Sequence, residues 1–500
     1  MAERLRPTGA PLPLGGVMLR TPGLDGVAEL QVAGAAGLRA VAEPSSAFLG
    51  ALDTAGFTEQ LTVAIVGAQE VTAASGSRAV AGDDAITVEV PGPGDGFAQV
   101  LLYTAEDGSL TWHLPEKATS STAAPTLRTG DRRTYRVPRA VVPTDDTPEE
   151  LAPPASRGLV ATVGRKLFQV FAVRLVQAAS RRAAGGLAAR WEAAHRPYGL
   201  RRFGPGGYDA PAGDLELCDA DWADLASGPA LLFVHGTFSR SHTAFGALPP
   251  ALMQALHARY GGRVFAFDHP TLGPDPAATA TWLGRELAGR GRLTVDVVAH
   301  SRGGLVAREI CEHGAEHGLG GVDVRRLVMV ATPNAGTALA DVGYWKTWVD
   351  RMTNILQFVP DNPVTDTFDA VLTLLTHVAV GTVHGLDGLR AMDPAGPYLR
   401  HRPNAAAPAC VSRYRAVAAD YEPPSGSPLW RVTRDLGTDL VFGAADNDLV
   451  VPTDGVFTVP GGAGFTIAEP LLFDAPAGVE HTGYWDREPF GRSLLGWLAA

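Results

Sequence analysis

The chain has 500 residues, of which 46% are hydrophobic and 19% charged, and its formal net charge is −11. This balance is typical of globular domains and excludes a disordered chain, and the length suits two to four domains. The acidic excess argues against a nucleic-acid-binding protein, and no run of about 18 uncharged apolar residues predicts a membrane span.

The three cysteines, Cys218, Cys311 and Cys410, stand far apart in the sequence. No two of them have the C-x-x-C spacing of a zinc site, and an odd number argues against a disulfide framework. The first residues carry charge and lack the apolar core of a signal peptide. We therefore expect a cytoplasmic protein without a thiolate metal site.

The first part of the chain predicts a smaller β-rich domain. Residues 1–55 are rich in Pro, Gly and Ala and are poorly patterned, whereas stretches of residues 56–143 alternate apolar and polar side chains as half-buried strands do. Within them, QVLLYTAEDGSLTWHLP is typical of a hairpin that turns at Asp107–Gly108.

Residues 144–211 are expected to form a linker and a basic amphipathic helix. The acidic, Pro-rich stretch 144–154 has the composition of a linker, and residues 155–196 carry apolar side chains at three- and four-residue steps. Residues 157–202 contain ten Arg or Lys against one acid, Glu192. We interpret them as a helix packed on the body with a solvated basic face. The alternative is weak contact with an anionic membrane surface.

From residue 212 to residue 500, short apolar strands alternate with helical stretches. The strands are ALLFVHG, RVFAFDHP, LTVDVVAHS and RRLVMVATP, and the helical stretches between them are 246–260, 276–290 and a helix from residue 302. This β-α-β-α order predicts a mostly parallel sheet that is covered by helices on both faces.

The segment DVVAHSRGGLVA joins one of these strands to a helix. His300, Ser301 and Arg302 form a sharp turn, which would hold the serine hydroxyl clear of the sheet. The residues two before and two after the serine must be small, and they are Ala299 and Gly303. G-x-S-x-G is the usual nucleophile elbow, and A-x-S-x-G is a tolerated variant of it. The alternative interpretation is a serine that only caps the helix.

A nucleophilic serine needs amide donors for the oxyanion that forms when it attacks a carbonyl. The strand before His235 ends in a loop whose Gly236 lets the backbone approach a substrate, so we expect the amides of Thr237 and Arg302 to form the oxyanion hole. The alternative is a plain glycine turn after a strand. The residues expected to line the substrate pocket are His235, Gly236, Phe238 and His300.

The remaining two parts of a catalytic triad are a carboxylate after a later strand and a histidine near the C-terminus. The segment GAADNDLVVP offers Asp448, with Asp446 as the alternative, and the Asp-x-Asp pair also gives a weak indication of Ca²⁺. His481 lies in the loop before the last helix and is the only histidine after His401. The alternative is a surface histidine.

Several segments resemble, in order, those of bacterial lipases and esterases of the α/β-hydrolase type: VHGTFS, FDHPTLG, DVVAHSRGGLVAR, VATPNAGT, GLRAMDPAGPYL, DLVVP and EHTGYW. The resemblance covers about residues 225–500. It implies an α/β-hydrolase fold with a mostly parallel central sheet and a helical cap or lid inserted at 338–412. The smaller β-rich domain and the linker helix would precede that fold.

We therefore predict a serine hydrolase that cleaves carboxylic esters through an acyl-enzyme on Ser301, with His481 as the base and Asp448 orienting it. Its substrate would be a small-molecule or lipid ester. The alternatives are an acyltransferase, thioesterase or amidase that uses the same triad, or a non-catalytic hydrolase-like binding module. No nucleotide-binding or metalloprotease motif is present, so we expect neither a cofactor nor a metal.

Overall fold

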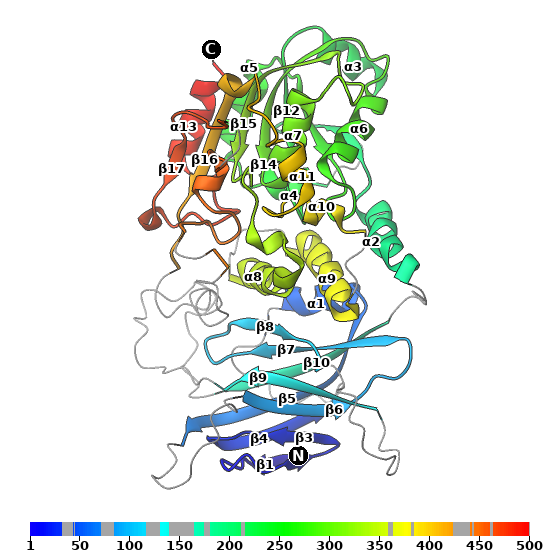
Figure 1. Cartoon of the computed structure of the whole chain (residues 1–500), viewed down its shortest axis with the longest axis vertical. Helices are drawn as coiled ribbons and strands as arrows, with labels where there is room; N and C mark the ends of the chain where they lie inside the picture. Colours follow the sequence, from blue (N-terminus) through cyan, green and yellow to red (C-terminus); the bar gives the residue numbers. More distant parts are fainter. Residues whose placement is uncertain are drawn as a thin grey trace.

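The computed structural model places the chain in three tiers (Figure 1). Two β-sheets from the N-terminal part form the lower tier, helices α1, α8 and α9 form the middle tier, and a larger sheet flanked by helices forms the upper tier. The structure describes residues 1–32, 44, 46–71, 85–116, 131–139, 165–174, 181–211, 216–358, 364–381, 385–423, 441–442, 445–460 and 464–499.

The N-terminal region forms two antiparallel sheets within the described residues. The six-stranded sheet has the order β1 (Ala2–Arg4), β4 (Leu24–Val32), β5 (Phe57–Glu70), β10 (Lys166–Arg174), β7 (Phe97–Thr104) and β8 (Leu110–His113). The four-stranded sheet has the order β2 (Leu12–Leu14), β3 (Val17–Arg20), β6 (Ala85–Pro91) and β9 (Arg132–Pro138). The expected hairpin is present as β7 and β8, which pair in antiparallel register.

Strands β7 and β10 of the six-stranded sheet are buried on both faces. In β7, Leu101 and Tyr103 point into a core that is shared with the four-stranded sheet. Val100 and Leu102 point the other way, into a core that also contains residues of α1 (Ser46–Thr54), α8 (Trp345–Phe358) and α9 (Val364–Val380). This period of two is the one that a strand imposes on its side chains.

Two expectations for the N-terminal half were wrong. Residues 1–55 were expected to be poorly patterned, yet they contain β1 to β4 and α1. Residues 155–196 were expected to be one helix, but residues 166–174 form strand β10 in the middle of the six-stranded sheet, and only α2 (Arg181–His195) is helical. A strand that is buried on both faces carries a continuous apolar run, which periodicity alone does not distinguish from a buried helix.

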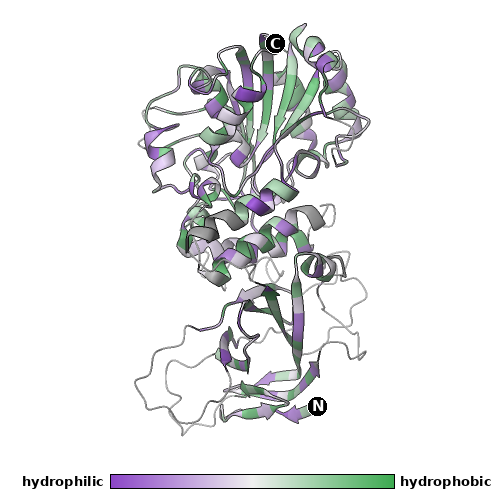
Figure 2. Cartoon of the chain, turned by 90° about the vertical axis from the view of Figure 1, so that its right-hand side faces the viewer, coloured by the Kyte–Doolittle hydropathy of each residue, from purple (hydrophilic) through white to green (hydrophobic). Residues whose placement is uncertain are grey.

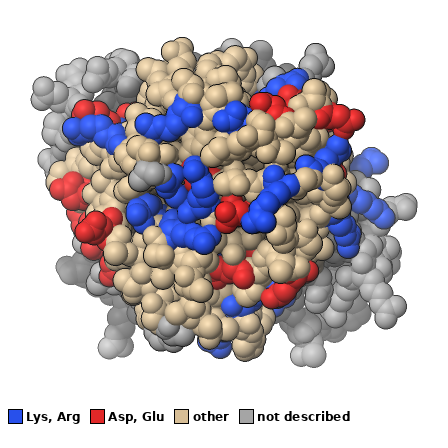
Figure 3. Space-filling view, turned by 90° about the horizontal axis from the view of Figure 1, so that it is seen from above, with Lys and Arg blue, Asp and Glu red and all other residues tan. Residues whose placement is uncertain are grey.

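The expected solvated basic face of residues 157–202 is therefore absent over β10. Lys166 is completely buried and pairs with Glu106, 2.9 Å away, and Arg201 is also buried. Basic side chains gather instead on the end of the molecule farthest from the N-terminal sheets (Figure 3). In this upper region, Arg325 and Arg326 pair with the buried Asp296. The acidic linker proposed for 144–154 lies outside the described residues.

The C-terminal region is built on a seven-stranded sheet within the described residues, and all of its neighbouring strands are parallel except β11. Its order is β11 (Gly199–Arg202), β13 (Val264–Asp268), β12 (Ala230–Val234), β14 (Leu293–His300), β15 (Val322–Val330), β16 (Tyr414–Ala419) and β17 (Leu471–Phe473). The predicted mostly parallel sheet is confirmed. It starts at Gly199, earlier than the expected boundary at residue 212.

Helices cover both faces of this sheet, whose strands are strongly hydrophobic (Figure 2). One face packs against α3 (Asp219–Ala226), α6 (Pro276–Glu286) and α7 (Arg302–Glu312). The other face packs against α4 (Ser241–Phe245), α5 (Pro250–Arg259) and α13 (Glu488–Trp497). The apolar strands follow from this burial on two sides.

The expected insertion at 338–412 contains α8, α9, α10 (Asp387–Arg390) and α11 (Pro397–His401). In Figure 1, α8 and α9 lie between the large sheet and the N-terminal sheets. Among the described residues, no helix combines the length and the apolar character needed to cross a membrane.

Candidate active site

Ser301 occupies a strained turn between β14 and α7. Its backbone φ is +52°, a left-handed value that residues other than glycine rarely adopt. A methyl group at Gly236 would lie 2.6 Å from the Cβ of Ser301, and one at Gly303 would overlap the carbonyl oxygens of Val234 and His235. Glycine is therefore required at Gly236 and at Gly303, because the loop of Gly236 and the serine turn approach each other closely.

The hydroxyl of Ser301 meets a histidine that lies 180 positions later in the chain. Ser301 Oγ is 3.0 Å from Nε2 of His481, and Nδ1 of His481 is 2.8 Å from Oδ2 of Asp448. A carboxylate at Nδ1 favours the tautomer that carries its proton there, which leaves Nε2 free to accept the serine proton. The three side chains thus have the geometry of a nucleophile, a base and an orienting acid.

Asp448 is completely satisfied as an acceptor. Its Oδ2 also accepts from the hydroxyl of Tyr484 at 2.8 Å, and its Oδ1 accepts from the amides of Val450 and Val451 at 3.1 and 2.8 Å. Burial by itself would raise the pKa of Asp448, but its interaction with His481 and these hydrogen bonds outweigh burial and lower that pKa. The carboxylate therefore stays ionised despite its burial.

The neighbouring acid does not take this place. Asp446 is exposed, and its backbone carbonyl accepts from the amide of Thr453 at 2.8 Å. The turn that carries Asp448 is strained, because Leu449 has a φ of +81°. No group of three or more side chains among the described residues is arranged to hold a metal ion.

Two amides are available beside Ser301 for an oxyanion. Arg302 is the first residue of α7, where an amide has no acceptor within the helix. The amide of Thr237 donates no hydrogen bond to any described residue, and Thr237 lines the cavity described below. The preceding Gly236 contacts the serine turn directly, so its loop lies against Ser301.

A cavity of about 330 Å³ opens beside this group. His300, His481 and Thr237 lie on its wall, and Met352 and Leu356 of α8 lie there as well. The remaining wall combines polar and apolar side chains, namely Asp209, Ser239, His242, Thr243, Ala244, Gly246, Ala247, Thr367, Thr482 and Trp485. This volume is at the small end of those that hold small ligands.

Of the four expected pocket residues, only His300 lies on this cavity. His235 is fully buried and accepts from the amide of His269 at 3.1 Å, while Phe238 packs edge-to-face on Trp348. Gly236 abuts Ser301. His235, Gly236 and Phe238 are therefore not on the wall of this cavity, because the loop turns the side chains of His235 and Phe238 inward and presents Thr237 and Ser239 instead.

His300 remains neutral beside Ser301 and His481. Burial, and then the charge of His481, lower the pKa of His300 to about 3. Its Nε2 lies 2.9 Å from the backbone carbonyl of His481, to which a neutral imidazole donates its proton. His300 thus positions the loop of His481 without competing for protons near neutral pH.

The sequence alone did not indicate the supporting residues. The guanidinium of Arg302 donates to the carbonyls of Gly388 and Pro274, which ties the serine turn to α10. The buried Glu192 of α2 accepts from the amides of Thr271, Leu272 and Gly273. Tyr484 follows His481 by three positions in EHTGYW, and Glu192 is the one acid among the basic residues 157–202, but neither observation indicated these contacts.

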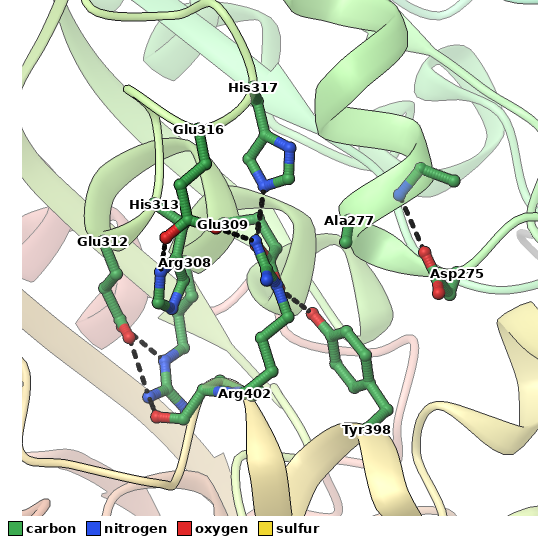
Figure 4. Close-up of polar contacts among 12 residues, drawn as sticks. Asp275, Ala277, Arg308, Glu309, Glu312, His313, Glu316, His317, Tyr398 and Arg402 are labelled. Atoms are coloured by element: carbon green, nitrogen blue, oxygen red, sulfur yellow. Dashed lines mark hydrogen bonds and ion pairs between the residues drawn. The ribbon is translucent and has the colours of Figure 1, made fainter.

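A buried polar network also anchors α7, the helix behind Ser301, to the end of the insertion (Figure 4). Glu309 of α7 accepts from the hydroxyl of Tyr398 at 2.7 Å and from Nε of Arg402 at 2.9 Å. Its other oxygen lies 2.8 Å from Nε2 of His317. Because a buried carboxylate with several donors resists displacement, this end of the insertion is fixed to α7.

Comparisons with solved structures return lipases at low similarity. One is lipase BlEst2 of Bacillus licheniformis in its mature form, at 20% identity over 54% of this chain and 91% of that one, with a TM-score of 0.31. Another is lipase 1 of Pelosinus fermentans, at 14% identity over 53% and 98%, with a TM-score of 0.32. Phospholipase PlaB of Legionella pneumophila matches at 14% identity over 46% and 45%, with a TM-score of 0.32.

Likeness at this level carries no information about what the chain acts on. No curated protein matches the sequence. A family model described as a domain of unknown function, DUF7379, matches residues 195–499, from just before β11 to the end of the last helix. The match spans more than half of the chain, and the protein therefore belongs to the DUF7379 family.

Proposed function

We propose that the protein is a serine hydrolase of the α/β-hydrolase type that cleaves carboxylic esters. The observation that carries this proposal is the continuous set of contacts from Ser301 Oγ to His481 Nε2 and from His481 Nδ1 to Asp448 Oδ2, at 3.0 and 2.8 Å. A serine that only caps a helix needs neither a strained φ nor a buried imidazole at its hydroxyl.

In the proposed reaction, His481 removes the proton from Ser301 as its oxygen attacks the acyl carbon of the substrate. The amides of Thr237 and Arg302 would hold the resulting oxyanion, and His481 then gives its proton to the departing alcohol. Water that is activated by the same imidazole releases the acid from the acyl-enzyme. Asp448, held ionised by its four donors, would stabilise the imidazolium in both steps.

The cavity supports a substrate of mixed character. Met352, Leu356 and Trp485 offer an apolar wall for an acyl chain, whereas Asp209 and Thr243 offer hydrogen-bonding groups for a polar alcohol portion. A volume of about 330 Å³ favours short or medium esters over a complete long-chain lipid.

A fluorophosphonate probe tests the proposal directly, because it reacts only with an activated serine. Wild-type protein should be labelled, and Ser301→Ala should lose both the label and the hydrolysis of 4-nitrophenyl esters. Labelling that survives Ser301→Ala would place the nucleophile elsewhere. Parallel assays with thioester and amide substrates, and with an added alcohol as acyl acceptor, separate the esterase from the thioesterase, amidase and acyltransferase that share this acyl-enzyme.

A further inference from the structure

Helix α8 is shared between the N-terminal sheets and the cavity. Its Asn354 bonds both backbone groups of one residue of β8: the amide of Leu110 donates to Oδ1 at 2.9 Å, and Nδ2 donates to the carbonyl of Leu110 at 2.7 Å. Strand β8 is the edge of the six-stranded sheet. The side-chain amide thus takes the place of a neighbouring strand along this edge.

Two further side chains of α8 accept hydrogen bonds from Trp112, which lies two positions after Leu110 on β8. The amide of Trp112 donates to Oδ1 of Asp350 at 2.7 Å, and its indole Nε1 donates to Oγ1 of Thr353 at 3.1 Å. Asp350 also pairs with Lys346 at 2.6 Å. Because Asp350, Thr353 and Asn354 are completely buried, losing these partners would leave polar groups unsatisfied in the interior.

The opposite side of the same helix faces the site. Successive residues of an α-helix are rotated by about 100°, so Met352 lies roughly 200° around the axis from Asp350. Met352 and Leu356 line the cavity beside His481. Between the two faces, the guanidinium of Arg351 donates to the carbonyl of Leu449, next to Asp448. One rigid helix therefore connects β8 to the wall of the substrate cavity.

We propose that the N-terminal β-domain determines which acyl chains the site accepts, by holding α8 through the positioning residues Asp350, Thr353 and Asn354. This proposal rests on the ester hydrolysis proposed above. The proposed triad and oxyanion amides lie in loops of the C-terminal region, and none of their hydrogen bonds described above joins them to β8. A small displacement of α8 would move Met352 and Leu356, which a long acyl chain must contact and an acetyl group need not.

Substitutions on the β8-facing side of α8 test this proposal with a panel of 4-nitrophenyl esters from acetate to decanoate. Asn354→Leu removes both hydrogen bonds to Leu110. Thr353→Val removes the acceptor for the indole N–H of Trp112. In Asn354→Leu we expect the decanoate-to-acetate ratio of kcat/KM to fall about tenfold, mainly through KM for decanoate. In Thr353→Val we expect a fall of roughly threefold. The kcat for acetate and the fluorophosphonate labelling should stay near wild type.

Two controls isolate the contact with β8. Thr353→Ser retains the hydroxyl and should restore the wild-type ratio. Thr373→Val makes the same change on α9, where the hydroxyl bonds only the carbonyl of Asp369 in its own helix, and should leave the ratio unchanged. If Asn354→Leu does not fold, as judged by circular dichroism, the Thr353 variants carry the test.

An unchanged ratio in folded Thr353→Val and Asn354→Leu would overturn the proposal, and so would an equal loss of activity on acetate and decanoate. A wild-type protein that neither reacts with the probe nor cleaves any ester would instead overturn the proposed function, on which this inference depends.

Discussion

The N-terminal and C-terminal regions differ in whether they contain strained backbone conformations. Among the described residues, every non-glycine residue with a positive φ lies in the C-terminal region: Phe238, Ser301, Ala331, Leu449 and Glu469. Ser301 is the proposed nucleophile, Leu449 follows the proposed triad acid Asp448, and Phe238 follows the proposed oxyanion donor Thr237. The N-terminal sheets contain no such residue in their described parts, which is the expected state of a relaxed scaffold.

The buried carboxylates of Asp448 and Glu106, one from each region, have opposite pKa shifts. Asp448 has its pKa lowered by a histidine and hydrogen-bond donors that outweigh the effect of burial. Glu106 has its pKa raised because burial outweighs the attraction of Lys166. The first environment preserves a charge for use at a cavity, whereas the second holds a pair together inside the sheet domain. Substitutions of Asp448 should therefore change chemistry, and substitutions of Glu106 should change stability.

The largest effect is expected for Asp448→Asn. The amide would keep the packing but would favour the wrong tautomer of His481, so kcat for ester hydrolysis should fall by about 10⁴. Asp446 lies two positions earlier and its side chain is exposed, so Asp446→Asn should leave kcat unchanged. Steady-state kinetics on both variants check this, and equal losses would contradict the assignment of the acid.

In the N-terminal region, Glu106→Gln should lower the free energy of unfolding by about 3–5 kcal/mol, because it leaves the buried ammonium of Lys166 without its counter-charge. The kcat for acetate should not change while the protein is folded. Glu116→Gln removes an exposed partner of Arg136, at 3.7 Å, and should cost at most about 0.5 kcal/mol. Urea unfolding of the three proteins measures the difference.

Gly236→Ala should disturb chemistry more than folding. Its new methyl group would meet the Cβ of Ser301, and a displacement of about 1 Å at a nucleophile costs roughly 10²-fold in kcat. Gly496→Ala in α13 places the same methyl group where no atom lies within 4 Å and should be silent. Wild-type kcat in Gly236→Ala would show that this close approach is not required.

The smallest effect concerns pH and should be alike in both regions. Burial lowers the pKa of His113 and of His300 to about 3, against 6.5 for the free side chain. Below pH 6.5 each of these histidines becomes protonated in the unfolded chain but stays neutral in the folded protein. The free energy of unfolding is therefore unaffected by these histidines above pH 6.5, and it decreases as the pH falls from 6.5 toward 3. At pH 5 each histidine should lower the free energy of unfolding by about 2 kcal/mol.

His113→Gln and His300→Gln isolate these contributions from those of other groups. Between pH 7 and pH 5, the wild type should lose about 2 kcal/mol more unfolding free energy than either variant. Parallel pH dependences in urea unfolding would show that the histidine concerned takes up its proton in the folded state.

Much of the C-terminal region could be predicted from local patterns. Uninterrupted apolar strands alternating with helical stretches indicate a parallel sheet, and small residues on both sides of Ser301 indicate a sharp turn, because each signal arises within a few neighbouring residues. The order of Ser301, Asp448 and His481 was also readable, and the structure brings these three side chains together. Their catalytic roles remain proposals.

Tertiary contacts decided the rest. Strand β10 has the apolar run of a helix, and only its place between β5 and β7 makes it a strand. The side chains of His235 and Phe238 turn inward because their loop packs on neighbours that are remote in sequence. Asn354 gives no local signal at all, since its meaning depends on Leu110, 244 positions away. Local sequence determines which elements form, but the partners of a buried polar group depend on how those elements pack.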